Sequence, residues 1–141
     1  MDRKRLKQKF EAEMQLALED ERRGELELAF RHLERAHILG QRWLTRHWRS
    51  HWAMLRVAKA KRESKEVRGQ ITRLAAVPLG WLTGWVPKGN TGGANVNPLK
   101  PMPYPPELAA EFSGYRVWRD VALRGVVLVG IVFAAAGRLS P

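Results

Sequence analysis

Hydrophobic residues in the first part of the chain recur at spacings of three and four, which is the period of an amphipathic helix. In residues 6–21 this stripe consists of Leu6, Phe10, Met14, Ala17 and Leu18. A second helix is predicted between Gly24 and Gly40, with a stripe made of Leu26, Ala29, Phe30, Leu33, Ala36 and His37. Glycine accepts the backbone reversal that often ends a helix, so the two glycines are predicted to mark helix boundaries.

A third helix is predicted after Gln41. Its broad, largely apolar face contains Leu44, His47, Trp48, His51, Trp52, Leu55 and Ala58. The opposite side is basic, with Arg46, Arg49, Arg56 and Lys59. An apolar face beside a basic one predicts a helix that is half buried.

A fourth helix is predicted from Ser64, as its N-cap, to about Ala76. Its buried side is expected to consist of Val67, Ile71 and Leu74. Pro78 is expected to end this helix or to begin a short amphipathic segment at residues 78–87. That segment carries Leu79, Leu82 and Trp85, which suit either packing on the helices or a membrane interface.

Glycine, asparagine and proline dominate residues 87–106, which predicts an irregular loop. The stretch from Lys88 to Asn95 is able to cradle an anion, but its lysine precedes the glycines and no P-loop pattern follows. A structural cap that folds back over the helices is the favoured interpretation. One or two helical turns are expected after the loop, in the sequence PELAAEF.

The C-terminal tail is the second informative hydrophobic feature. Residues 121–137 contain a single charge, Arg124, but spanning a bilayer takes roughly 20 apolar residues. The tail is therefore interpreted as a membrane anchor, with a buried C-terminal helix as the alternative. Arg116 and Arg119 precede it, so the positive-inside rule leaves the body of the protein in the cytoplasm.

Composition adds charge to this outline. The 141 residues carry a formal net charge of +11, which favours an anionic partner, either nucleic acid or anionic lipid, unless the charge only keeps the protein soluble. Cysteine is absent, which excludes disulfides, thiolate metal sites and a cysteine nucleophile. The first ten residues lack the apolar region of a secretory signal. Tryptophans interleave with arginines in residues 42–56, but no nucleic-acid motif accompanies them, so nucleic-acid binding is disfavoured.

Two resemblances bear on the fold. The spacing of Gly24, Ala29, Leu33 and Ala36 is similar to that of the second helix of a tetratricopeptide repeat (TPR). Residues 33–41 (LERAHILGQ), the histidines that follow and residues 89–95 (GNTGGAN) resemble a bacterial family of short proteins classed as domain of unknown function 3703. This second resemblance covers about residues 15–108, leaves out the hydrophobic tail and implies no activity.

Candidate ligands gather around the predicted helical hairpin. If the second and third helices reverse near residues 40–43, then His37 lies opposite His47, and Glu34 lies opposite His51. The preceding turn sets Glu13 opposite Glu34. These five residues form a candidate site for a transition metal, namely zinc, iron or copper, with manganese also admitted.

Two observations limit this metal hypothesis. Only one Glu-x-x-His helix is present, whereas di-iron sites use two, and no His-Glu-x-x-His motif occurs. The alternatives are buried polar pairing and an acid–base site without metal. The fourth histidine, His32, lies off the stripe and is predicted to be a surface residue.

We therefore predict an all-α protein, a TPR-like helical hairpin extended to about four helices. Residues 1–86 form the helical bundle, residues 87–106 the loop, and residues 107–141 a short helix and the hydrophobic C-terminal tail. The predicted function is that of a non-enzymatic accessory or interaction protein of the bacterial cytoplasm, attached to the inner membrane by the C-terminal helix and binding an as yet undefined protein partner. The alternative is a histidine and glutamate metalloprotein that stores a transition metal or performs redox or hydrolytic chemistry.

Overall fold

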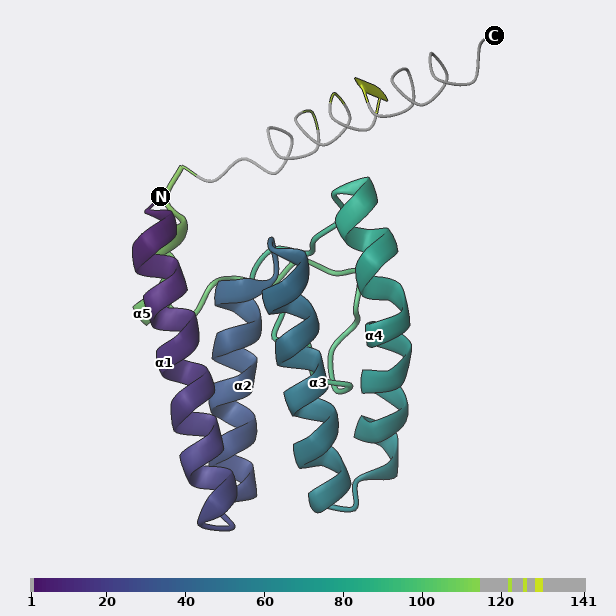
Figure 1. Ribbon diagram of the computed structural model, residues 1–141. Coiled ribbons are helices and arrows are strands. Elements are labelled where there is room, and N and C mark those ends of the chain that lie inside the picture. Colours follow the sequence, from purple (N-terminus) through teal and green to yellow (C-terminus); the bar gives the residue numbers. More distant parts are fainter. Residues whose placement is uncertain (1, 115–121, 123–125, 127–128, 131–141) are drawn as a thin grey trace, which may run out of the picture.

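The computed structural model describes residues 2–114 together with positions 122, 126, 129 and 130, and within these residues the fold is all-helical. The elements are α1 (Arg3–Arg22), α2 (Leu26–Gly40), α3 (Leu44–Ala60), α4 (Ser64–Thr83), the short α5 (Pro106–Ala109) and the 3₁₀ helix η1 (Ala110–Phe112). Figure 1 shows the four long helices side by side in chain order. Each packs chiefly on its neighbours in sequence.

Local interactions fix the ends of the first helix. The Asp2 carboxylate accepts hydrogen bonds from the backbone N–H groups of Lys4 and Arg5, at 2.8 and 3.2 Å. This cap satisfies two of the amide donors that a helix leaves unpaired at its N-terminus. At the other end Gly24 adopts a φ of +78°, which turns the chain directly into α2. The helix boundaries predicted at Gly24 and Gly40 are thus confirmed to within about two residues.

The apolar stripes of α1 and α2 meet in two clusters. One cluster joins the N-terminal half of α1 to the end of α2, α5 and η1, and it contains Leu6, Phe10, Ala36, Ile38, Leu39, Leu108 and Phe112. The other joins α1, α2 and α3 through Ala17, Ala29, Leu33, Ala53, Met54 and Val57. Because α1 and α2 both contribute to each cluster, this helix pair is the centre of the hydrophobic core.

The fourth helix differs from the prediction at both ends. It continues through Pro78 to Thr83, where Gly84 ends it with a φ of +73°. Leu74 and Val77, in the turn just before Pro78, are buried, and this packing helps to offset the one backbone hydrogen bond that proline removes. Ser64 is the first helical residue and not the N-cap, which is Glu63.

Three large side chains that were expected to be buried are exposed instead. Trp48 and Trp52 of α3 and Ile71 of α4 all reach solvent. The buried positions of α4 are Glu66, Gln70, Leu74 and Val77. The period of apolar residues alone could not predict the buried face of α4, because two of its four residues, Glu66 and Gln70, are polar.

The chain after α4 folds back over the helices and then crosses to α5, which lies beside α1 (Figure 1). The predicted structural cap is therefore confirmed. Arg73 donates to the carbonyl oxygens of Gly93 and Val96, and the Glu66 carboxylate accepts from the Ala94 N–H. At its far end the Glu111 carboxylate binds Lys9 and Arg5 of α1 at 2.7 and 2.9 Å.

Within the described residues, none of the helices has both the length and the apolar character needed to cross a bilayer. The hydrophobic tail predicted at residues 121–137 lies outside the described residues, save for isolated positions. Its interpretation as an anchor stays a prediction.

Candidate metal centre

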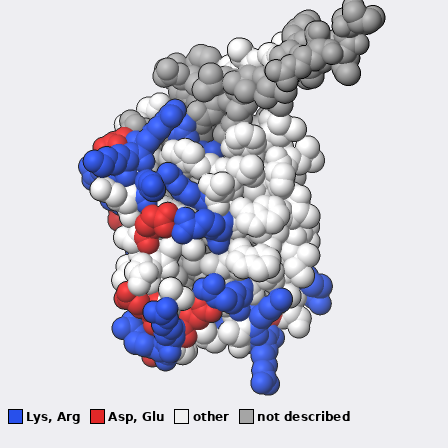
Figure 2. Space-filling view, viewed as in Figure 1, with Lys and Arg blue, Asp and Glu red and all other residues white. Residues whose placement is uncertain are grey.

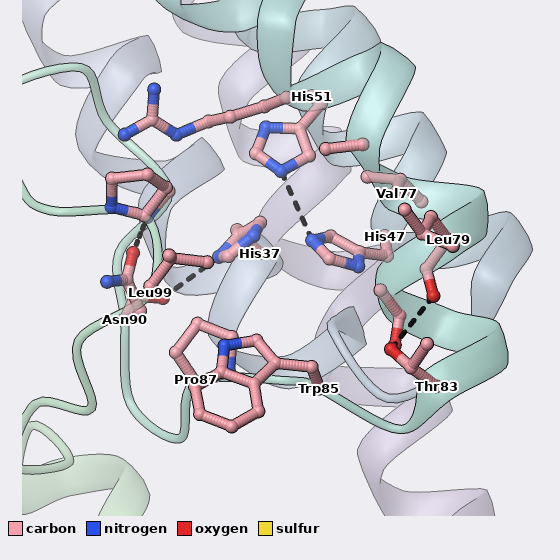
Figure 3. A pocket seen from close by; sticks show the side chains of 15 residues that line it. His37, His47, His51, Val77, Leu79, Thr83, Trp85, Pro87, Asn90 and Leu99 are labelled. Carbon is pink, nitrogen blue, oxygen red and sulfur yellow. Dashed lines mark hydrogen bonds between the residues drawn. The ribbon is translucent and has the colours of Figure 1, made fainter.

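Three histidine rings meet between the end of α2 and the first two turns of α3. His37 comes from α2, and His47 and His51 come from α3, one helical turn apart. The ring centroids are 4.6 to 4.9 Å apart, and one nitrogen from each ring lies within 4.8 Å of the other two. Figure 3 shows the rings pointing toward one another. We call these residues the histidine trio.

The hydrogen bonds of two trio members fix which nitrogen carries the proton. His37 Nδ1 lies 2.9 Å from the carbonyl oxygen of Asn90, which only accepts, so this nitrogen must donate. The Gln70 amide nitrogen donates to Glu66 and to the Gly92 carbonyl, which leaves Gln70 Oε1 to accept from His51 Nδ1 at 2.7 Å. In both rings Nε2 therefore keeps its lone pair.

The third ring completes the arrangement. His47 Nε2 lies 3.1 Å from His51 Nε2 and donates to its lone pair while the rings are neutral. Among the described residues, neither His37 Nε2 nor His47 Nδ1 has a hydrogen-bond partner, although both atoms are buried. A buried polar atom without a partner costs about 1–3 kcal/mol, so these two nitrogens are the ones available to a partner from outside the described chain.

The surroundings keep all three rings neutral. Burial lowers the pKa of His47 to about 3 and that of His51 to about 4, and it holds the pKa of His37 well below its usual value. Positive charge on the neighbouring rings would lower the pKa values of His37 and His47 further. The trio thus presents unprotonated nitrogens across the whole physiological pH range.

A cavity of about 340 Å³ opens beside the trio. Its walls come from α2, α3, α4 and the loop, and most of them are apolar side chains such as Val77, Leu79, Trp85, Pro87 and Leu99 (Figure 3). Such a concave, mostly apolar space with a few converging polar atoms is typical of a small-molecule site.

The glycine and asparagine loop holds the trio in place. Gly92 has a φ of +82°, and a Cβ atom at this position would stand 2.8 Å from Cγ of His37. Glycine is therefore required on two counts, backbone conformation and close approach. Asn90 is itself fixed by donating to the carbonyl oxygens of Asn97 and Lys100, at 2.8 and 2.9 Å.

The two predicted glutamates lie apart from the trio. Glu13 is bound by His32 at 2.7 Å and by Arg35 at 2.9 Å, so its carboxylate is already neutralised. His32, predicted to be a surface residue, is partly buried in this pairing. Glu34 approaches the loop at Gly93, and burial, followed by repulsion from Glu66, raises its pKa. Within the described residues the ligand group contains the three histidines alone.

Sequence reasoning missed the residues that support the rings, namely Gln70, Glu66 and Asn90. Gln70 and Glu66 stand four apart on α4, a spacing that signals a polar buried face once the apolar stripe is seen to be short. The side chain of Asn90 turns the loop by accepting from the Gly92 N–H, a role typical of asparagine. Neither pattern by itself points to a histidine.

Comparison with known proteins gives one match. The family model described as "Protein of unknown function (DUF3703)" matches residues 4–112, which include the whole histidine trio and the loop. No curated protein and no solved structure matches the chain. The TPR-like description of the helices therefore stays a prediction.

Proposed function

The chain belongs to the DUF3703 family, and we propose from the arrangement of its histidines that it is a transition-metal-binding protein with a three-histidine centre. The observation that carries this proposal is the convergence of three buried, neutral imidazoles, two of them held by Nδ1 acceptors. An Nδ1–H held by an oxygen acceptor is the usual state of a histidine that binds metal through Nε2.

The distances support a mononuclear site. Zinc–nitrogen bonds of about 2.0–2.1 Å in a tetrahedron place ligand nitrogens about 3.3 Å apart. The His47 and His51 nitrogens already lie at 3.1 Å, and no pair among the three ligand atoms exceeds 4.8 Å. Small side-chain rotations suffice to bring the set to bonding distance. A metal ion bound through the Nε2 atoms would also give His37 Nε2 the partner that it lacks within the described chain.

The donor set favours particular metals. Three imidazoles without a thiolate suit Zn²⁺ and Cu²⁺, which bind such sites more tightly than Fe²⁺ does. Behind His51, Gln70 connects the ring to the Glu66 carboxylate through bonds of 2.7 and 2.6 Å. That relay polarises the His51 imidazole toward a bound cation. Three protein ligands leave a fourth position open, as in catalytic zinc sites, and here it would face the cavity.

Elemental analysis and calorimetric titration with Zn²⁺ and Cu²⁺ test this proposal on the purified full chain. The double variant His37→Gln, His47→Gln is compared with His32→Gln, which removes a histidine outside the trio. We expect one metal ion per chain for the native protein and for His32→Gln. The double variant should stay helical by circular dichroism and lose at least a hundredfold in affinity. A native chain that binds neither ion, or a double variant that binds as tightly as the native chain, would overturn the proposal.

We also propose that the protein associates with a membrane surface. Supporting this, Leu79, Leu82, Trp85 and Leu99 are exposed together near the end of α4, whereas basic side chains gather on the α1 side of the face shown in Figure 2. Sedimentation of the full chain with vesicles of phosphatidylcholine and phosphatidylglycerol is the test. Leu82→Asp should lower the bound fraction severalfold, and unchanged binding would contradict this role for the patch.

A further inference from the structure

The walls of the cavity beside the histidine trio are mostly apolar. Their apolar members are Ala76, Val77, Leu79, Trp85, Pro87, Pro98 and Leu99. A volume of about 340 Å³ corresponds to roughly ten water molecules, and hence to a ligand of about ten non-hydrogen atoms. That is at the lower end of the range for small-molecule sites.

The polar side chains in these walls are engaged elsewhere. Arg73 directs its guanidinium at the loop, where it donates to the carbonyl oxygens of Gly93 and Val96 at 2.8 and 2.9 Å. The Thr83 hydroxyl donates to the Leu79 carbonyl at 3.0 Å, within its own helix. The side-chain amide of Asn90 donates both its hydrogens to loop carbonyl oxygens, those of Asn97 and Lys100. A ligand in the cavity would find no free charge there among the described residues.

One point in the cavity differs from the rest. His37 Nε2 and His47 Nδ1 are buried ring nitrogens without a partner in the described chain, and both rings line the cavity. The buried polar atoms to which a ligand could bind directionally are therefore concentrated at the trio. Elsewhere the described walls offer mainly apolar contact, with the indole N–H of Trp85 on the exposed rim.

The rim of the cavity is apolar as well. Leu79, Trp85 and Leu99 line the cavity and are 65%, 61% and 61% exposed. A ligand that reaches the trio would pass between these side chains and cover part of them. Burying such exposed apolar surface stabilises the complex and selects against charged molecules.

We infer that the cavity binds a small, uncharged, mostly apolar molecule whose single donor atom occupies the open position at the histidine trio. This inference rests on the proposed function, because the donor atom is to bind the metal ion held there. The molecule is recognised by one lone pair at its buried end and by an alkyl or aromatic body along the cavity.

The test uses the full chain loaded with Co²⁺, whose visible absorption reports direct ligation, and two probes, 4-phenylimidazole and imidazole. Both present the same donor, and only the first carries an apolar body. We expect phenylimidazole to change the Co²⁺ spectrum and to bind at least tenfold more tightly than imidazole. Equal affinities would overturn the inference, since the cavity walls would then contribute nothing.

Two matched variants locate the bound probe. Leu99→Asp puts a charge on the cavity rim at an exposed position, so the fold should be kept, and phenylimidazole affinity should fall at least tenfold. Leu82→Asp changes an exposed leucine that does not line the cavity, and affinity should be unchanged. Loss of affinity in both variants or in neither would overturn the assignment.

The two proposals fail in different ways. If the three-histidine centre is wrong, the chain takes up no Co²⁺ and no visible absorption develops before any probe is added. If only the inference about the ligand is wrong, the Co²⁺ protein forms and then binds the two probes alike.

Discussion

The helix α2 carries two histidines, five residues apart, whose surroundings differ in kind. His32 faces α1, where its ring meets the Glu13 carboxylate at 2.7 Å and Asp20 at 3.5 Å. His37 faces α3 and the loop, where its neighbours are two more imidazoles and a backbone carbonyl. The first is a histidine paired with two carboxylates, and the second is one of three rings whose nitrogens converge. Residue type alone does not distinguish them, but their partners do.

The largest expected effect is that of acid on the stability of the fold, through the buried rings of the trio. The folded-state pKa values of His47 and His51 are about 3 and about 4, below the ordinary value of about 6.5 for an unfolded chain. Below pH 6.5 the unfolded chain therefore binds more protons than the folded one, so stability is full above pH 6.5 and is lost as pH falls toward 4. The slope is up to about 1.4 kcal/mol per pH unit for each ring. Urea unfolding of the metal-free protein between pH 7 and 4 measures it.

His47→Gln is the companion to that measurement. Removing one ring should reduce the proton uptake on unfolding near pH 5 by about one proton per chain. An unchanged pH slope would mean that His47 is not held neutral by burial.

The contact between the loop and His37 gives the next largest effect. Gly92→Ala should lower the free energy of unfolding by about 3 kcal/mol, because the new methyl group meets the His37 ring and the backbone is strained at a φ of +82°. Gly24→Ala is the control, since its φ is +78° but a Cβ atom there meets nothing within 4 Å. It should cost about 1–2 kcal/mol. Equal losses in the two variants would show that the close approach to His37 contributes little.

The relay behind the trio should affect metal affinity as well as stability, because Gln70 is buried and makes three hydrogen bonds. Gln70→Met removes the acceptor that orients His51, and Zn²⁺ affinity should fall about 10–100-fold. Gln15→Met is a matched control on the exposed face of α1, where the side chain donates to Glu19 and has no other partner among the residues that the structure describes. Competition with a chromogenic chelator measures both. A Gln70 variant with native affinity would show that the trio does not depend on this relay.

The smallest effect on the trio is expected from a change to Glu13, the α1 carboxylate that pairs with His32 of α2. Glu13→Gln weakens the pairing with His32 and Arg35 and should cost about 1–2 kcal/mol of stability. Zn²⁺ affinity should stay within twofold of native, because this carboxylate is not part of the trio. A large loss of Zn²⁺ affinity would show that the pairing of Glu13 with His32 is coupled to the trio.

The sequence predicted much of this arrangement because most of it is local. The all-helical fold, the turns at Gly24 and Gly40 and the facing of His37 and His47 all follow from residues close together in the chain. The hairpin rule gives the level of a residue along its helix but not its direction around the axis. For this reason Glu34 was placed opposite His51, whereas the structure places Gln70 against His51 and the loop against Glu34.

The residues that hold the histidine rings in place could not be predicted from the sequence, for a physical reason. His51 and Gln70 are separated by 19 positions, and His37 and Asn90 by 53. No local period connects residues so far apart, and a polar residue in a buried stripe weakens the very pattern that would reveal the stripe. Trp48 and Trp52 show the opposite error, because apolar character alone placed them inside.

The bond between His37 and the carbonyl of Asn90 has a consequence for rates. One trio member is oriented by a segment that returns from far along the chain and is held by a few hydrogen bonds across α4. Opening of that segment alone would free the His37 ring while the helices stay paired. A bound ion would then exchange at the rate of this local opening, which is faster than unfolding of the whole domain.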